Sequence, residues 1–454
     1  MSKKISLASY FLILTGALTL LLNAGCKKYL SSKSDKSLAI PSNLVDLQAL
    51  MDDYSRINYG VGAGLTCADE YYLTESQFEG LYVDEDRRMY IWEDEDVIDS
   101  KDNGWVRSYD NIYRANTALE VISKIDRDPV NKDEWDNVKG EALFLRGRSF
   151  FEVAMVWAEA YDKGNSETKL GIPLRLGTDF NVPSVRSNLE DTYRQIISDL
   201  KASIGFLPKK AAHVFRASKP AACGELARVY LSMRMYDSAF FYSNEALKYF
   251  SYLLDYNTVD TSMRYPFERF GPEVIYETTL YMTFAAYNNV DSTIYQMFDD
   301  NDLRKPLFFY GNKDGSQMFC GSYNNTFAAF GGIASDELYL MRAECLARQA
   351  KLDLALKDLN FLLQKRYLKG SFTLRESNDA KEVLEWILNE RVKELLFRGL
   401  RWIDIKRFNK EGADITLKRT IGGKEYILPP GDLRYAVAIP KDIIENSDIK
   451  QNPR

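Results

Sequence analysis

The sequence predicts a mainly α-helical protein in which paired helices form a scaffold and long irregular segments are inserted between them. Apolar residues recur at helical spacing over residues 105–161, 189–249 and 336–407. Within the last two ranges small residues repeat with one spacing, which indicates two related helix pairs. The stretches 58–102 and 257–332 are rich in aromatic residues but have no sustained period, so we expect them to be loops.

Residues 1–25 are predicted to be a lipoprotein signal peptide. Two lysines precede an almost unbroken apolar run over residues 5–22, and Ala-Gly stands directly before Cys26. This order is typical of an export signal. The ending resembles a bacterial lipobox, with Asn23 where Leu is usual. We therefore expect Cys26 to be acylated and the polar residues 26–37 to form a tether. A plain signal peptide and a retained membrane helix are the alternatives.

The helices of the remaining chain, which we expect to form one domain over residues 38–454, can be assigned in order. Leu44 begins a first amphipathic helix. Trp105, Tyr109 and Ile112 start a buried stripe after the first irregular stretch. A Gly-Ile-Pro sequence then breaks the helical pattern at residues 171–173. The helices expected around this break cover residues 44–51, 105–125, 135–161 and 189–207.

The repeated spacing is that of a tetratricopeptide helix pair. Small residues at these positions let two helices approach closely, and larger residues fill the gap between them. The chain contains two such sets with identical separations of 3, 9 and 7 residues: Ala227, Tyr230, Ala239 and Ala246, and then Ala343, Leu346, Ala355 and Leu362. Because the sets are far apart in the chain, we do not expect a regular solenoid.

Composition excludes several classes of function. The 59 basic and 65 acidic residues give a net charge of −6, which argues against a nucleic-acid binder. The single histidine, His213, lies in a Lys/Ala-rich segment where we expect a solvated loop. A multi-histidine metal site or a histidine-based hydrolase is therefore disfavoured. No CxxC spacing is present, so we predict no zinc site and no cofactor. A Cys67–Cys320 disulfide is left open.

Motifs along the whole mature chain resemble those of the SusD/RagB family. They are the residues 26–30, 109–116, 141–147, 171–174, 389–407, 438–440 and 450–453, with Phe408 where Trp is common. The family consists of cell-surface lipoproteins of Bacteroidetes that bind nutrients, usually glycans, beside a TonB-dependent outer-membrane transporter. The resemblance implies a SusD-like fold, a lipid anchor in the outer membrane facing the exterior, a SusC-like transporter as partner, and no enzymatic activity.

Charged residues in the block 389–407 suggest a catalytic interpretation, which we reject. A Glu390/Glu394 pair has no nucleophile or metal beside it in the sequence. We expect Glu394, Arg398 and Arg401 to form a charge ladder on one helix. Gly399 should end that helix, and Trp402 should anchor the chain on the core.

Two further charged stretches have simple interpretations. The acids at 94, 96 and 99 lack the glycine and the terminal glutamate of a calcium loop, so we expect a solvated acidic loop. Asp302 and Arg304 should form a local ion pair. No catalytic and no metal-ligating residue is predicted.

Aromatic residues in the two irregular stretches are the candidate ligand-binding residues. Sugars present apolar C–H faces, which bind flat aromatic side chains. We expect one extended groove from residues 58–102 and 281–330, with the platform residues Tyr72, Tyr82, Trp92, Tyr287, Tyr310 and Tyr323. Trp92 is the strongest candidate because its ring is the largest. The alternatives are that each ring packs under its loop, and that the protein is an envelope scaffold that binds peptide or protein partners.

Overall fold

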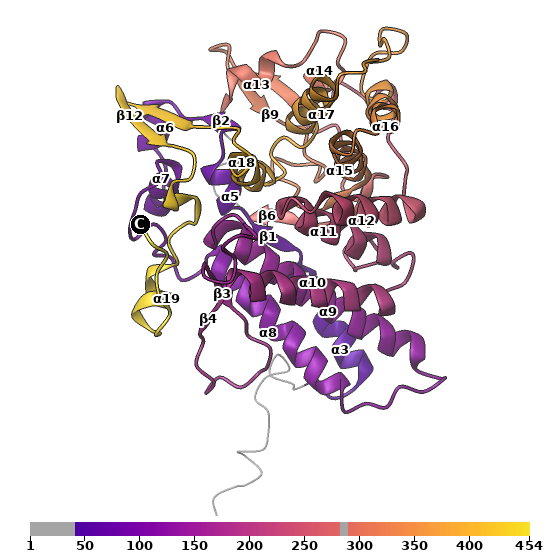
Figure 1. The fold of residues 1–454 in the computed structure, drawn as a ribbon, viewed down its shortest axis with the longest axis vertical. Helices are drawn as coiled ribbons and strands as arrows, with labels where there is room; N and C mark the ends of the chain where they lie inside the picture. The colour runs from indigo at the N-terminus through magenta and orange to yellow at the C-terminus, as the bar shows by residue number, and fades with distance from the viewer. Residues whose placement is uncertain (1–40, 282–288) are drawn as a thin grey trace, which may run out of the picture. The chain divides into compact units, whose positions relative to one another are not determined.

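The scaffold is a row of helices in which each helix packs against the next (Figure 1). The computed structural model describes residues 41–281 and 289–454. The prediction of a mainly α-helical fold built on helix pairs is confirmed. The helices of the row are α8 (Gly104–Ile122), α9 (Lys132–Trp157), α10 (Leu189–Phe206), α11 (Lys219–Ser232), α12 (Tyr236–Tyr249), α15 (Ser335–Arg348), α16 (Leu352–Gln364) and α17 (Ala380–Glu394).

Polar side chains fix where these helices begin and end. The side chains of Asn103 and Asn188 accept hydrogen bonds from the first turns of α8 and α10, and Ser218 does the same for α11. Such caps satisfy backbone N–H groups that have no partner within the helix. At the other end of α9, the buried Lys406 Nζ donates to the carbonyls of Met155 and Ala158, at 2.8 and 2.6 Å.

The two tetratricopeptide-like pairs are neighbours in space. All eight residues of the repeated pattern are buried, as the close approach of the helices requires. Helix α12 packs directly against α15, although the segment 257–332 separates them in the sequence. The chain therefore leaves the row of helices after α12 and returns to the same place at α15, so the insert does not interrupt the packing of the helices.

The break at residues 171–173 forms a short strand that passes so close to the start of α10 that no side chain fits at Gly171. A Cβ atom on Gly171 would lie 2.1 Å from Thr192 Oγ1 and 2.4 Å from the Asn188 carbonyl oxygen. Strand β3 (Leu170–Pro173) pairs with β4 (Arg186–Asn188), which leads into α10. The glycine thus permits the chain to pass directly over the start of that helix.

Both segments expected to be loops contain regular structure, which corrects the sequence prediction. Their α-helices have five to seven residues, too few for a period to be recognised. The first segment follows α4 (Tyr54–Ile57) and contains β1 (Tyr59–Val61), α5 (Ala63–Cys67), β2 (Tyr71–Tyr72), α6 (Glu75–Glu79) and α7 (Asp84–Tyr90). The second contains β5 (Val274–Tyr276), β6 (Thr279–Tyr281), β7 (Asn289–Val290), α13 (Ser292–Gln296), α14 (Arg304–Phe308), β8 (Phe309–Gly311) and β9 (Gln317–Phe319).

Strand pairing joins these two segments. Strand β1 pairs with β6 in parallel, and β2 pairs with β7 in an antiparallel four-stranded sheet of order β2-β7-β9-β8. Segments more than 200 residues apart in the sequence are therefore hydrogen-bonded to each other. The remaining elements are α3 (Leu44–Met51), β10 (Ile333–Ala334), α18 (Arg401–Asn409), the hairpin β11 (Leu417–Ile421) and β12 (Lys424–Leu428), and α19 (Lys441–Glu445).

The charge ladder expected on the C-terminal block is wrong. Helix α17 ends at Glu394, before the other two members of the ladder, and Gly399 has a φ of +72° in the turn that leads into α18. Arg398 pairs instead with Asp336 of α15, and Arg401 donates twice to Asp69, at 2.7 and 2.8 Å. Each charged side chain reaches a different element, so the block connects parts of the fold. Trp402 is buried, as predicted.

No helix within residues 41–281 and 289–454 is long and apolar enough to cross a membrane. Cys26 lies outside the described residues, and so does the predicted signal peptide.

Candidate ligand-binding face

Two of the predicted platform residues lie in one row across the four-stranded sheet. Tyr72 is in register with Asn289, Asn289 with Met318, and Met318 with Tyr310. Residues in register on paired strands point to the same face of a sheet. Tyr72 and Tyr310 therefore stand on one face, separated by three strand spacings, or about 14 Å. They are 38% and 49% exposed, respectively.

The opposite face of the same sheet is buried in the core. Tyr71, Val290 and Phe309 alternate with the row along their strands, and each is less than 10% exposed. The ring of Tyr71 lies 6.3 Å from that of Phe397, which follows α17. The inner face thus holds the sheet against the scaffold. On the outer face the two tyrosines are exposed, whereas Asn289 between them is only 2% exposed.

Polar side chains border the row. Asn289 Nδ2 donates to Gln77 Oε1 of α6 at 3.0 Å, which fixes the amide between the two tyrosines. The guanidinium group of Arg264 lies 4.9 Å from the centre of the Tyr310 ring. A cation on one face of an aromatic ring limits the motion of that ring. The arrangement is therefore two exposed rings with an amide and a guanidinium group beside them.

The other predicted platform residues have different positions. Tyr82 is fully exposed between α6 and α7, and it remains a prediction. Tyr287 lies outside the described residues. Trp92 and Tyr323 are only 4% and 5% exposed, so we withdraw both from the set. These two rings belong to the core.

Hydrogen bonds explain why these two rings are buried. The indole Nε1 of Trp92 donates to the Cys67 carbonyl at 3.0 Å. The hydroxyl of Tyr323 lies 2.8 Å from Glu273 Oε2 and 2.9 Å from Asp336 Oδ2, beneath the guanidinium group of Arg398. Each ring satisfies polar groups of the core, which are costly to leave without partners.

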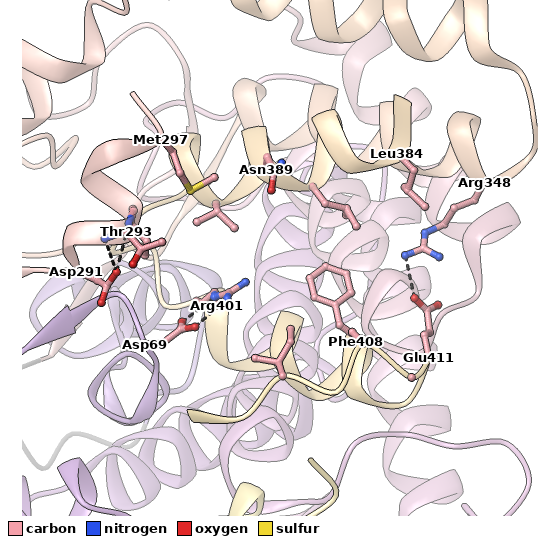
Figure 2. A pocket seen from close by; sticks show the side chains of 16 residues that line it. Asp69, Asp291, Thr293, Met297, Arg348, Leu384, Asn389, Arg401, Phe408 and Glu411 are labelled. Atoms are coloured by element: carbon pink, nitrogen blue, oxygen red, sulfur yellow. Dashed lines mark hydrogen bonds and ion pairs between the residues drawn. The ribbon is translucent and has the colours of Figure 1, made fainter. Parts of the chain in front are cut away.

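A separate pocket of about 740 Å³ lies beside α13, α17 and α18 (Figure 2). Its volume is in the range of small-molecule sites. Its aliphatic wall includes Leu384, Leu388 and Val392, spaced four residues apart on α17. The Asp69–Arg401 pair stands at one end, and Arg348 pairs with Glu411 at 2.9 Å at the other.

Some polar groups of this pocket have no hydrogen-bond partner among the described residues. Asp291 Oδ1 accepts hydrogen bonds from the first turn of α13, whereas Oδ2 has no partner among the described residues. The Asn389 side chain also faces the pocket (Figure 2). None of the four residues of the row lines this pocket, so the two are separate. Its wall is mostly aliphatic, and the Phe408 ring that also lines it is only 8% exposed, so the pocket offers little stacking surface for a sugar.

Three buried carboxylates lie close enough together to hold a metal ion: Glu273, Asp336 and Glu394. Arginines already occupy their oxygens. Arg366 Nε donates to Glu394 at 2.7 Å and Arg366 Nη2 to Glu273 at 3.0 Å, while Arg398 pairs with Asp336. A metal ion would have to displace these guanidinium groups. The cluster therefore fits a structural ion network better than a metal site.

The same network accounts for the rejected catalytic pair. Arg304 is fully buried and pairs with Glu390 and Glu394 as well as with Asp302. Burial alone would raise the pKa of Asp302, but Arg304 and Lys393 outweigh it and hold that pKa at about 2. The predicted Asp302–Arg304 ion pair is thus confirmed, and it extends into a network that ties the second insert to α17.

The other charged stretches are also engaged. Asp94, Asp96 and Asp99 each pair with a basic side chain: Arg434 at 3.7 Å, Lys441 at 2.9 Å and Arg88 at 2.8 Å. Two of these partners lie near the C-terminus, so the acidic segment is fastened to the end of the chain.

His213 and the cysteines differ from expectation. The His213 ring is half-buried and lies 4.4 Å from the Phe215 ring and 4.6 Å from the Phe270 ring. It therefore packs against aromatic residues, whereas the sequence predicted a solvated loop. Cys67 and Cys320 are both free and buried, so they do not form the disulfide left open by the sequence.

Sequence reasoning missed Asn289, Met318, Gln77 and Arg264. Asn289 and Met318 join the row through strand register, which two- and three-residue strands do not reveal in a sequence. Gln77 and Arg264 lie outside the strands and reach the row only through tertiary contacts.

Comparisons with known proteins identify the family. The family described as starch-binding associating with outer membrane matches residues 28–231, and the SusD family matches residues 336–436. No match was found among curated proteins.

Solved structures share the fold over nearly the whole chain. A SusD superfamily protein from Bacteroides thetaiotaomicron is 20% identical with a TM-score of 0.74, and the match covers 91% of this chain and 100% of that one. A protein from Bacteroides vulgatus, named as a candidate sugar-binding protein, is 22% identical with a TM-score of 0.75, covering 91% and 99%. A SusD-like carbohydrate-binding protein from the same species is 18% identical with a TM-score of 0.67, covering 88% and 96%. The two family matches, with this shared fold, place the chain in the SusD/RagB family.

Proposed function

We propose that this protein is a cell-surface lipoprotein that captures a glycan on the outer face of the four-stranded sheet and delivers it to a TonB-dependent outer-membrane transporter. The observation that carries the proposal is the row from Tyr72 to Tyr310 across four paired strands. Two exposed rings in fixed register offer stacking surfaces for the C–H faces of sugar rings.

The form of the row favours an extended ligand. The two rings are about 14 Å apart, farther than one sugar ring can bridge. Arg264 and the half-buried Gln77, which accepts a hydrogen bond from the buried Asn289, supply hydrogen-bonding groups beside the rings. An oligosaccharide lying across the strands would contact both tyrosines, whereas a monosaccharide would contact only one. We therefore infer that the ligand is a chain of sugars.

Capture without cleavage fits the state of the acidic residues. Glycoside hydrolysis needs two carboxyl groups flanking the scissile bond. The closely spaced carboxylates at Glu273, Asp336 and Glu394 are buried and paired with arginines. They lie in the core, away from the exposed face of the sheet.

The anchor and the partner complete the proposal. Cys26, preceded by an apolar run and Ala-Gly, would carry the acyl chains that hold the protein at the outer membrane. The matched family is described as associating with the outer membrane, which supports that location. A SusC-like transporter is the partner that this family membership favours.

Glycan-array binding followed by two substitutions tests the proposal. Tyr72→Ala and Tyr310→Ala should each weaken binding by about five- to a hundred-fold, since loss of one stacked ring costs ~1–3 kcal/mol. Tyr252→Ala is the matched control because Tyr252 is similarly exposed but lies away from the sheet. If Tyr72→Ala and Tyr310→Ala bind the glycan as tightly as Tyr252→Ala does, the proposal that the ligand binds on this face is wrong. Release of free sugar from the glycan would refute capture without cleavage.

A further inference from the structure

The loop between β3 and β4, residues 174–185, exposes several large apolar side chains. Phe180 is 79% exposed and Val185 72% exposed, and Leu176 and Val182 are about half exposed. Single exposed apolar residues are ordinary on protein surfaces, but a contiguous group on one loop marks an interaction site. In Figure 1 this loop lies at the lower left, beside α19.

The loop is held in place although it has no regular secondary structure. Tyr109 Oη donates to the Pro173 carbonyl at 2.8 Å, and Asn116 Nδ2 donates to the Arg175 carbonyl at 2.9 Å. The rings of Tyr113 and Phe180 lie 5.0 Å apart. Three residues of α8 thus fix the loop from beneath. A surface that is fixed before binding loses little conformational entropy when a partner docks.

The loop forms one wall of a groove of about 900 Å³. Tyr109 and Tyr113 of α8 line its floor, and α19 with residues 446–449 forms the opposite wall. Arg186 connects the two walls, because its Nε donates to the Gly171 carbonyl at 2.7 Å and its Nη1 to the Lys450 carbonyl at 3.0 Å. The groove is therefore formed before any ligand binds.

Charges at the groove are mainly negative. Asp110, Asp442 and Asp448 line it together with Arg175, and Asp110 is paired with Arg114 of the same helix at 2.9 Å. The guanidinium group of Arg175 donates to carbonyls of the loop itself, so it shapes the wall. Asp442 Oδ1 is buried and has no hydrogen-bond partner in the part of the chain that the structure describes. A buried carboxylate oxygen without a partner favours a ligand that brings a donor.

We propose that this groove is the docking site for a segment of a partner protein that presents an aromatic or branched apolar side chain next to a lysine or arginine. The apolar loop would pack on the first side chain, and Asp442 and Asp448 would pair with the second. Carboxylates disfavour an anionic lipid surface as the occupant. That the partner is the transporter rests on the proposed function, whereas the chemistry of the groove does not.

Photocrosslinking from the groove in the full-length lipoprotein tests this site. Phe180 is replaced by the photoreactive amino acid benzoylphenylalanine, membranes of the native host are irradiated, and the attached peptide is identified by mass spectrometry. We expect an adduct with another protein at a segment that has Lys or Arg within two positions of an apolar residue. Adding Val185→Asp should lower the yield about tenfold, since it places a charge in an apolar contact.

Val130→Asp is the control, because Val130 is 95% exposed in the connection between α8 and α9 and should leave the yield unchanged. Adducts only with lipid, with saccharide or with a second copy of the chain would overturn the proposal, and so would a yield that Val185→Asp does not alter. Glycan affinity of the purified Val185→Asp protein should equal that of the wild type. A protein that crosslinks but binds no glycan would refute the proposed function and leave this docking site standing.

Discussion

Replacing Arg304 with methionine should destabilise the fold more than any exposed charge would. Arg304 is fully buried and is the common partner of Asp302, Glu390 and Glu394. Methionine retains an unbranched apolar side chain but removes the charge, which leaves buried carboxylates with fewer partners. Removing one partner of a buried ion pair costs ~3–5 kcal/mol, and we expect a loss in this range.

The remaining cations limit that loss. Lys393 stays paired with Asp302 at 2.7 Å, and Arg366 stays paired with Glu394 at 2.7 Å. Among the described residues Glu390 keeps only the cation of Lys393, at 3.7 Å, and so should carry most of the penalty. Neutralising it with Glu390→Gln in the Arg304→Met protein should therefore recover part of the lost stability.

Urea unfolding followed by circular dichroism measures the effect, with the slope against urea checked for constancy. Arg127→Met is the control, because Arg127 forms an exposed pair with Asp136 and should cost ~1 kcal/mol or less. The defect of Arg304→Met should shrink at pH 5, where carboxylates that have lost their partner take up protons. A loss no larger than that of the control, or one that does not depend on pH, would refute the network described here.

Three further outcomes are expected. Burial raises the pKa of Glu70 to about 8 and the pKa values of Glu141, Glu152 and Glu277 to about 7, so their folded forms hold protons that the unfolded chain releases above about pH 4.5. The free energy of unfolding should then fall from pH 5 to pH 7, and a rise over this range would contradict the burial. Cys26→Ala should move the protein from the membrane to the soluble fraction, and persistence at the membrane would refute the anchor. Denatured protein should react with a thiol reagent to the same extent with and without prior reduction, since Cys67 and Cys320 are free.

The sequence predicted the long helices well because burial on one side of a helix leaves a period of 3.6 residues. Helices α8 and α10 begin within one residue of the predicted start, and both are capped by asparagine. The order of the row was harder to predict. Packing of α12 against α15 joins residues on either side of the second insert, and no local pattern encodes that contact.

The aromatic residues show where sequence reasoning stops. Tyr71 and Tyr72 are adjacent and chemically identical, yet one is buried and the other is 38% exposed. The difference comes from the alternation of a two-residue strand, which is set by pairing with β7. Trp92 was ranked first for the size of its ring, but that size also makes it a good core residue. Ring size alone did not separate the two roles.

For the charged residues, the sequence led to predicted contacts that were too local. Spacing along α17 and α18 suggested contacts within one helix, but Arg398 and Arg401 reach α15 and Asp69. A buried charge needs a partner wherever the fold provides one, and that partner is usually distant in the sequence.

The most direct test of glycan capture on the sheet is a double-mutant cycle with oligosaccharides of increasing length. Affinities of the wild type, Tyr72→Ala, Tyr310→Ala and the double variant are measured by titration calorimetry for each length of a glycan that binds. Binding of a ligand too short to span about 14 Å should be weakened by only one of the substitutions, and binding of longer ligands by both. Binding that neither substitution weakens at any length would contradict the account.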